Sequence, residues 1–177
     1  MSRGPDFKAL IAQHGSPLLL LDCAVVRRQY KSLQAALPGV GLFYALKPLP
    51  HPAVVAELRD LGGCFDVATS GEIRLVRNAG IAAERCIHTH PIKTDAEIRA
   101  ALRFGIRTFV VDNPDELRKF RKHRSRAEVL LRLSFRDPTA VVDLSRKFGC
   151  EPAAVAPMLE LAQSLGVKVR GLSFHVG

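Results

Sequence analysis

FGIRTFVVDNPDE, residues 104–116, joins the end of one helix to a strand and to the start of the next helix. Gly105 stands where a helix C-terminus needs a left-handed residue. The apolar run 108–111 is rich in β-branched and aromatic residues and predicts a buried strand. NPDE at 113–116 then opens a helix, since it offers a capping residue, a proline at the first helical position and an acid at the third.

The same unit recurs along the chain. Further glycine closures stand at Gly62, Gly80 and Gly166, and a strand begins a few residues after each. Strands that alternate with helices at a spacing of about 21 or 22 residues predict parallel βαβ units. We expect six strands, over residues 41–46, 64–68, 86–89, 108–111, 129–133 and 170–176.

Helix starts and apolar stripes fill the intervals between these strands. Ser70 before Glu72 and Thr94 before Asp95 are typical of helix N-termini. Residues 17–21 predict an extra strand, and Asp22 then caps a helix. Apolar positions at helical spacing follow on the predicted helices, for example Val26, Tyr30, Leu33 and Leu37, then Val54, Leu58 and Leu61, then Val155, Leu159 and Ala162.

Parallel βαβ units form either a doubly wound sheet or a (β/α)8 barrel. No GxGxxG or GxxxxGK[ST] motif follows any strand, which favours the barrel of the TIM type. A closed barrel needs eight strands and about 250 residues, so a chain of 177 residues with six strands predicts an incomplete one. We expect residues 23–177 to form this partial barrel and residues 1–22 to reach toward another domain.

Composition sets further bounds. Apolar residues make up 47% and charged residues 24% of the chain, and the longest apolar runs are too short to span a bilayer or to serve as a secretory signal. We therefore expect a cytoplasmic globular protein without a membrane partner. Four cysteines without a CxxC pair indicate reduced, mostly buried thiols.

A net charge of +9 suits nucleic acid, an acidic surface or a phosphorylated ligand. The densest basic cluster, residues 118–126, has Phe120 as its only aromatic residue, so it lacks the stacking groups of a single-strand binder. We interpret the cluster as a solvated helix end and expect no nucleic-acid partner.

Polar side chains stand where the predicted strands end, the edge at which parallel barrels place their chemistry. With period two, Lys47 shares a face with Ala45, and His175 shares one with Ser173, so both side chains can point into one mouth. Burial there favours the neutral amine that a Schiff base requires. Each residue also has a plainer interpretation. Lys47 would be a snorkelling lysine at the start of a loop, Asp66 an acid that pairs with Arg132, and a histidine within a strand a core residue. The strand ends carry Lys47, Asp66, His88, His90, Asp112, Arg132 and His175.

Four ordered segments together resemble the fold-type III pyridoxal-phosphate decarboxylases of ornithine, lysine, arginine and diaminopimelate. The segments are FYALK at 43–47, GCFDVATSGE at 63–72, LSRKFG at 144–149 and SFHVG at 173–177. The resemblance runs from about Pro17 onward. It implies an alanine racemase-like barrel followed by a β-domain, pyridoxal 5'-phosphate as cofactor, a small amino-acid substrate and a homodimer.

The resemblance also implies roles for individual residues. Lys47 is similar to the lysine that forms the Schiff base with the cofactor, and His175 to the imidazole that stacks on its pyridine ring. Asp66, Glu72 and Arg132 are similar to the charged groups around lysine and cofactor. Two departures concern substrate choice, since Lys47 is followed by Pro48-Leu49 and His90 stands where asparagine is common.

The function expected from the resemblance is decarboxylation of a basic amino acid. The family's glycine-rich phosphate loop lies beyond Gly177, so we expect residues 1–177 alone to be inactive. Residues 134–142 interrupt the even spacing of the repeat and predict a loop over the mouth.

Two other classes of function stay open. A metal-dependent barrel hydrolase would use His88 and His90, with Asp66 or His175 as a third ligand. A non-catalytic protein that binds pyridoxal phosphate, or a regulatory pseudoenzyme, would keep the barrel without turnover.

Overall fold

The computed structural model of the protein describes residues 5–135 and 147–175. Its sheet has six parallel strands in the order β1-β2-β3-β4-β5-β6, so each strand pairs with its neighbours in sequence. The six predicted strands are confirmed, with ends that differ by at most three residues. They are β1 (Phe43–Ala45), β2 (Cys64–Val67), β3 (Cys86–His88), β4 (Thr108–Val111), β5 (Glu128–Arg132) and β6 (Lys168–Ser173).

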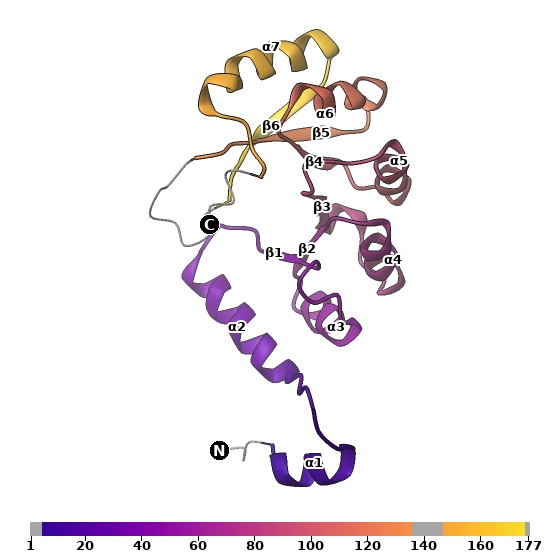
Figure 1. The fold of residues 1–177 in the computed structure, drawn as a ribbon, viewed down its shortest axis with the longest axis vertical. Coiled ribbons are helices and arrows are strands. Elements are labelled where there is room, and N and C mark those ends of the chain that lie inside the picture. The colour runs from indigo at the N-terminus through magenta and orange to yellow at the C-terminus, as the bar shows by residue number, and fades with distance from the viewer. Residues whose placement is uncertain (1–4, 136–146, 176–177) are drawn as a thin grey trace.

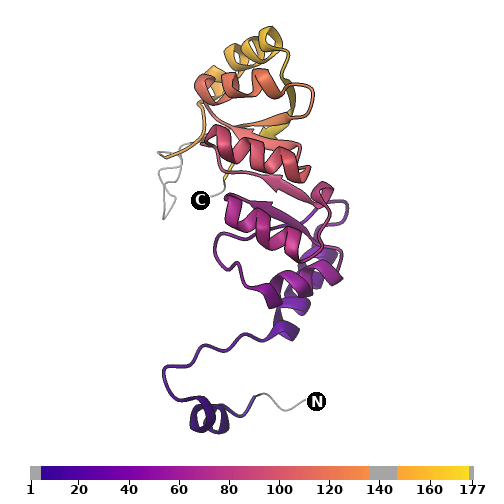
Figure 2. The same cartoon turned by 90° about the vertical axis from the view of Figure 1, so that its right-hand side faces the viewer.

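Helices alternate with these strands and lie along one side of the curved sheet (Figures 1 and 2). This arrangement is the incomplete barrel that the repeat predicts, with β1 and β6 at the edges of the described sheet. The helices are α1 (Phe7–His14), α2 (Cys23–Ala36), α3 (Pro52–Asp60), α4 (Ser70–Asn78), α5 (Asp95–Phe104), α6 (Pro114–Lys119) and α7 (Val155–Leu165), with short 3-10 turns at η1 (Ala83–Arg85), η2 (Phe120–His123) and η4 (Pro152–Ala154).

Local signals fix where most of these helices begin and end. Thr94 caps α5 in a complete capping box with Glu97, and Asn113 caps α6 ahead of Pro114. The cap of α4 is Thr69, whose hydroxyl accepts from the amide of Glu72, so the predicted start is one residue late. All four predicted glycine closures have positive φ: Gly62, Gly80, Gly105 and Gly166.

The core lies between the sheet and the helices. Alternate strand residues point toward the helices and are fully buried, as Phe65 on β2 and Phe109 on β4 illustrate. Removing such a side chain from water stabilises the fold by about 1.5–3 kcal/mol. On α7 the predicted apolar stripe is wrong in one position, because Met158 packs into the core while Leu159 stays 43% exposed.

The predicted strand at residues 17–21 does not form. This segment is extended without strand pairing, and Leu19 is 92% exposed. An extended segment needs a neighbouring strand for its backbone groups, and the described chain places none beside it. The helix that follows, α2, begins after Asp22 as predicted and packs Val26 and Tyr30 against the core.

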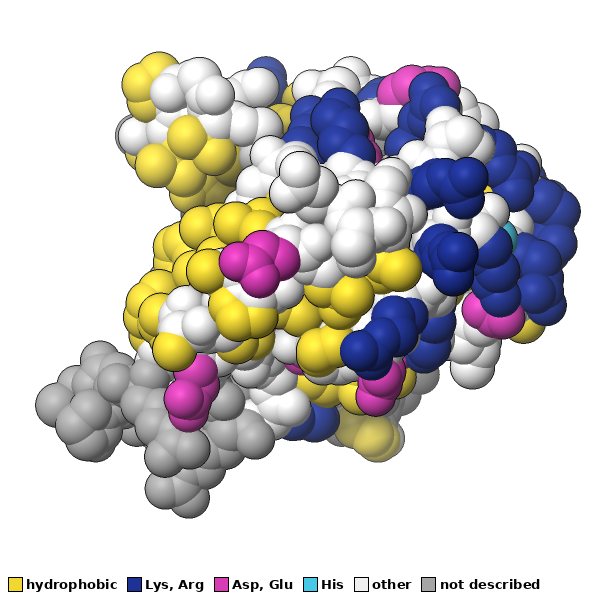
Figure 3. All heavy atoms as spheres, turned by 90° about the horizontal axis from the view of Figure 1, so that it is seen from above, with side chains coloured by type: hydrophobic (Ala, Val, Ile, Leu, Met, Phe, Trp, Pro, Cys, Tyr) yellow, Lys and Arg dark blue, Asp and Glu magenta, His cyan; other side chains and the backbone are white. Residues whose placement is uncertain are grey.

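Charged side chains are unevenly distributed. Figure 3 shows Lys and Arg gathered on the side of the molecule where the outer helices lie. Five of the six basic residues in 118–126 are exposed, which confirms the solvated helix end, and Phe120 is buried in the core.

The cysteines are free thiols, as expected, but Cys86 is the one that is buried and the other three are half-buried. Across residues 5–135 and 147–175, no helix has both the length and the apolar character needed to cross a membrane.

Candidate active site

A cavity of about 290 Å³ opens at the carboxyl ends of the strands. Its wall includes four of the five predicted site residues, contributed by β1, β2, β5 and β6 or the residues just after them. The polar side chains that line the cavity are Lys47, Asp66, Thr89, His90, Arg132, Lys147 and His175.

Strand register explains why these side chains converge. Ala45 on β1 pairs with Asp66 on β2, so the cavity-facing positions of the two strands lie side by side. Arg132 on β5 pairs with Ser173 on β6 in the same way. Period two then brings Lys47 and His175 to the same mouth, as the sequence predicts.

Asp66 is held by Thr89 rather than by an arginine. The amide of Thr89 donates to Oδ1 of Asp66 at 3.2 Å, and the Thr89 hydroxyl lies 2.7 and 2.6 Å from the two carboxylate oxygens. Burial raises the pKa of Asp66 to about 6, and the hydrogen bonds from Thr89 oppose this shift. The alternative in which Asp66 pairs with Arg132 is therefore wrong.

Glu72 lies beside the cavity and does not line it. It stands in the first turn of α4, where its Oε2 accepts from the amide of Ala68 at 2.6 Å. Ala68 is itself part of the cavity wall. Glu72 thus braces the loop after β2, and its negative charge contributes to the raised pKa of Asp66.

Lys47 and His175 are exposed at the mouth. The expected burial of Lys47 is not found among the described residues, because β1 is an edge strand there and the loop after it has a neighbouring strand on one side. Both side chains nevertheless line the cavity.

Phe148 completes the wall, a role that no sequence signal marks apart from the LSRKFG segment. The guanidinium carbon of Arg132 lies 5.4 Å from the centre of the Phe148 ring, and the His90 ring centre lies 5.7 Å away. The position of Phe148 depends on Gly149, whose amide donates to Oδ2 of Asp112 at 2.9 Å. Asp112 therefore ties the segment after Lys147 to the end of β4.

The two histidines of the His88-Thr89-His90 run do not share a face. His88 is buried on the helix side, stacked 5.8 Å from Phe109, and burial lowers its pKa to about 4. His90 follows the last residue of β3, where the chain turns, and lines the cavity. Within the described ranges no three His, Cys, Asp or Glu side chains are grouped to hold a metal ion, so the metal-centre interpretation has no support there.

The predicted loop over the mouth falls mostly on residues 136–146, outside the described residues. Of its described part, Phe135 is 58% exposed.

The cavity suits an anionic carbonyl compound. Three cations, Lys47, Arg132 and Lys147, face one carboxylate, Asp66. Nε of Arg132, which lines the cavity, is buried without a hydrogen-bond partner among the described residues and so remains as a donor for a ligand. An amine that can bind a carbonyl carbon, beside a guanidinium and an imidazole, fits pyridoxal phosphate. The fold and site thus define a parallel barrel of the pyridoxal-binding class.

Comparison with known proteins places the chain more narrowly. Residues 23–177 match the protein family described as "Pyridoxal-dependent decarboxylase, pyridoxal binding domain". The chain therefore belongs to the pyridoxal-dependent decarboxylase family and carries its pyridoxal-binding domain.

Individual relatives agree. The lysine/ornithine decarboxylase of Selenomonas ruminantium is 34% identical over 172 residues, which cover 97% of this chain and 44% of that protein. The crystal structure of lysine/ornithine decarboxylase complexed with putrescine from Vibrio vulnificus is 51% identical, with a TM-score of 0.88 over 96% of this chain and 44% of that chain. Antizyme inhibitor 2 of Xenopus laevis is 39% identical over 153 residues, 86% of this chain and 33% of that protein. The chain thus spans less than half the length of these relatives.

Proposed function

We propose that the protein carrying this sequence decarboxylates a basic amino acid with pyridoxal phosphate. One observation carries the proposal, namely that Lys47, Asp66, Arg132 and His175 line one cavity at the carboxyl ends of parallel strands. When bound, the cofactor supplies an electron sink for the pair of electrons left behind as carbon dioxide departs.

Each residue has a distinct task in this proposal. Nζ of Lys47 would hold the cofactor at its carbonyl carbon and would carry a proton at the same atom. His175 would contact the cofactor ring. Arg132 supplies positive charge to an anionic group, and Asp66, together with Glu72 beside it, supplies negative charge near Lys47. Phe148 excludes water from one side of the guanidinium of Arg132.

The substrate class rests on the relatives. The similar structure from Vibrio vulnificus is complexed with putrescine, a diamine, and the relative from Selenomonas is named for both lysine and ornithine. We therefore propose ornithine or lysine as substrates to be tested first, followed by arginine and diaminopimelate. We also propose that the protein is a cytoplasmic homodimer and that its residues 1–22 reach a β-domain.

A second candidate function is a non-catalytic, regulatory protein built on the same barrel. The observation that favours it is the 39% identity with a relative named as an antizyme inhibitor rather than as a decarboxylase. Both candidates keep the pyridoxal-binding fold.

Release of labelled carbon dioxide from each amino acid separates the two candidates. The assay uses the natural-length protein that contains residues 1–177, loaded with pyridoxal phosphate. We expect release from at least one of the four substrates and its loss in Lys47→Ala. Cofactor binding without any release would instead support the regulatory candidate.

A further inference from the structure

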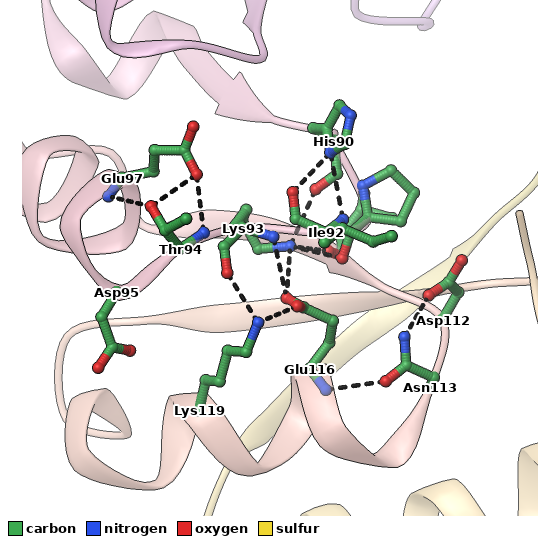
Figure 4. Close-up of polar contacts among 12 residues, drawn as sticks. His90, Ile92, Lys93, Thr94, Asp95, Glu97, Asp112, Asn113, Glu116 and Lys119 are labelled. Atoms are coloured by element: carbon green, nitrogen blue, oxygen red, sulfur yellow. Dashed lines mark hydrogen bonds and ion pairs between the residues drawn. The ribbon is translucent and has the colours of Figure 1, made fainter.

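A lysine outside the proposed site is buried directly behind the cavity wall. The side chain of Lys93, in the loop between β3 and α5, is 1% exposed. Its ammonium donates to the carbonyl oxygens of His90 and Pro91 at 2.9 Å each and to that of Val110 on β4 at 2.6 Å. Figure 4 shows this cluster, with Glu116 and Lys119 on the helix below Lys93.

Two groups of α6 complete the cluster. Oε2 of Glu116 lies 3.5 Å from the ammonium of Lys93 and also accepts from the Lys93 amide at 3.3 Å. Lys119 pairs with the same carboxylate and donates to the carbonyl oxygen of Lys93 at 2.8 Å. Burial lowers the pKa of Lys93 to about 8, and the charge of Glu116 opposes this shift.

Chain geometry explains why a cation is needed here. β3 pairs with β4 only through His88 and Phe109, and the residues after β3 turn away toward the cavity. Beyond that pair, the Lys93 ammonium takes the place of a ladder hydrogen bond, since it donates to the carbonyl oxygen of Val110. Pro91 has no amide hydrogen with which to do so.

The segment fixed in this way forms part of the cavity. Thr89, His90 and Pro91 all line it. The amide and hydroxyl of Thr89 in turn hold Asp66. Without the ammonium, the carbonyl oxygens of His90, Pro91 and Val110 would lack this donor, and the loop would have to move to hydrate them.

We propose that Lys93 is a positioning residue, whose buried ammonium holds the segment 89–92 against β4 and thereby sets Asp66 and His90 at the cavity. Lys93 touches neither cofactor nor substrate in this proposal. The inference deepens the proposed function, because the group served by the positioned residues is pyridoxal phosphate.

The first test measures backbone order without any cofactor. In the natural-length protein, Lys93→Met keeps the length of the side chain and removes its charge. We expect the amides of Thr89 and Ile92 to exchange hydrogen about ten-fold faster, while the amide of Leu131 in β5 changes less than about two-fold. Equal acceleration at Leu131 would mean a general loss of stability and would overturn the inference, as would no change at Thr89.

Two further variants keep this test decisive. Lys122→Met is the matched control, because Lys122 is half-exposed and pairs with Asp95, the first residue of α5, outside the segment 89–92, and it should leave both amides unchanged. Glu116→Gln keeps the acceptor oxygen and removes one charge. If Lys93→Met does not fold, Glu116→Gln must show the same local acceleration to a smaller extent, and its absence would count against the inference.

The second test links Lys93 to the cavity. The dissociation constant of pyridoxal phosphate, followed by fluorescence, should rise about ten-fold in Lys93→Met and about as much in Thr89→Val, which releases Asp66. The double variant should be little weaker than either single one, since both changes act through the same contact. Fully additive losses would overturn the inference. Failure of the unmodified protein to bind the cofactor would overturn the proposed function instead, and the exchange result would still stand.

Discussion

Asp66 lies in surroundings that differ strongly from those of a surface acid. Burial raises its pKa to about 6, above the ordinary value of 3.8. Protonation of Asp66 therefore stabilises the folded state fully below pH 3.8, and this contribution is lost as the pH rises through 6. The loss amounts to at most about 3 kcal/mol.

Replacing Asp66 by asparagine should remove this pH dependence. The amide oxygen can still accept from Thr89, and no charge has to be buried. We expect Asp66→Asn to match the unmodified protein at pH 4 and to exceed its free energy of unfolding by about 2 kcal/mol at pH 7.5. Urea unfolding of the natural-length protein at both pH values measures the difference. An equal free-energy difference at both pH values would show that Asp66 titrates normally.

At the scale of single residues, the sequence predicted which side chains line the cavity together. It did not predict which groups hold those side chains in place. Period two and the strand ends bring Lys47, Asp66, Arg132 and His175 to one cavity. The partner of Asp66 is Thr89, which follows the end of β3, where alternation no longer applies. The buried ammonium of Lys93 was missed for a related reason, because its acceptors are backbone carbonyl oxygens that no side-chain pattern marks.

Among the elements, the short segment 147–150 has the largest effect on the site. Gly149 has a φ of +102°, and a Cβ there would lie 2.8 Å from the backbone of Leu133. Gly149→Ala should therefore push the segment outward and carry Phe148 away from Arg132. We expect weaker binding of pyridoxal phosphate by about ten-fold, measured by fluorescence titration.

Gly39→Ala is the control for backbone strain. Gly39 has a similar left-handed φ of +80°, and nothing lies within 4 Å of an added Cβ. This variant should lose some stability and keep its cofactor affinity. If both variants weaken binding equally, the effect comes from backbone strain and not from the displacement of Phe148.

Helices and strands were predictable where the signal is local. Caps such as Thr94 and Asn113 satisfy free backbone amides with a neighbouring side chain, so they can be identified from a few residues. The predicted strand at residues 17–21 was wrong because apolar composition alone does not supply a pairing partner. On α7, Met158 and Leu159 are adjacent and both apolar, and only the packing decides which one is buried.

At the scale of the whole molecule, the sheet formed by residues 5–135 and 147–175 is open. β1 and β6 form its edges, and apolar side chains near them are exposed, with Phe43 at 40% and Leu172 at 56%. Open edges favour pairing with another chain, and an open site admits water. The order of the six strands followed from the repeat, whereas nothing in the repeat could show what lies against β1 and β6.

We expect the isolated 177-residue chain to self-associate and to release no carbon dioxide above background from ornithine, lysine, arginine or diaminopimelate. Sedimentation velocity and the labelled-substrate assay measure the two properties on one sample. A single monomeric species with turnover equal to that of the natural-length protein would contradict the interpretation of the chain as an incomplete barrel.

The most direct test of the proposed site identifies the lysine that binds the cofactor. The natural-length protein is incubated with pyridoxal phosphate, reduced with borohydride, digested and mapped by mass spectrometry. The site geometry predicts a phosphopyridoxyl group on Lys47 and unmodified peptides for Lys93, which is buried, and for Lys147, which lines the same cavity. Modification of Lys147 or of any other lysine, with Lys47 unmodified, would contradict the proposed site.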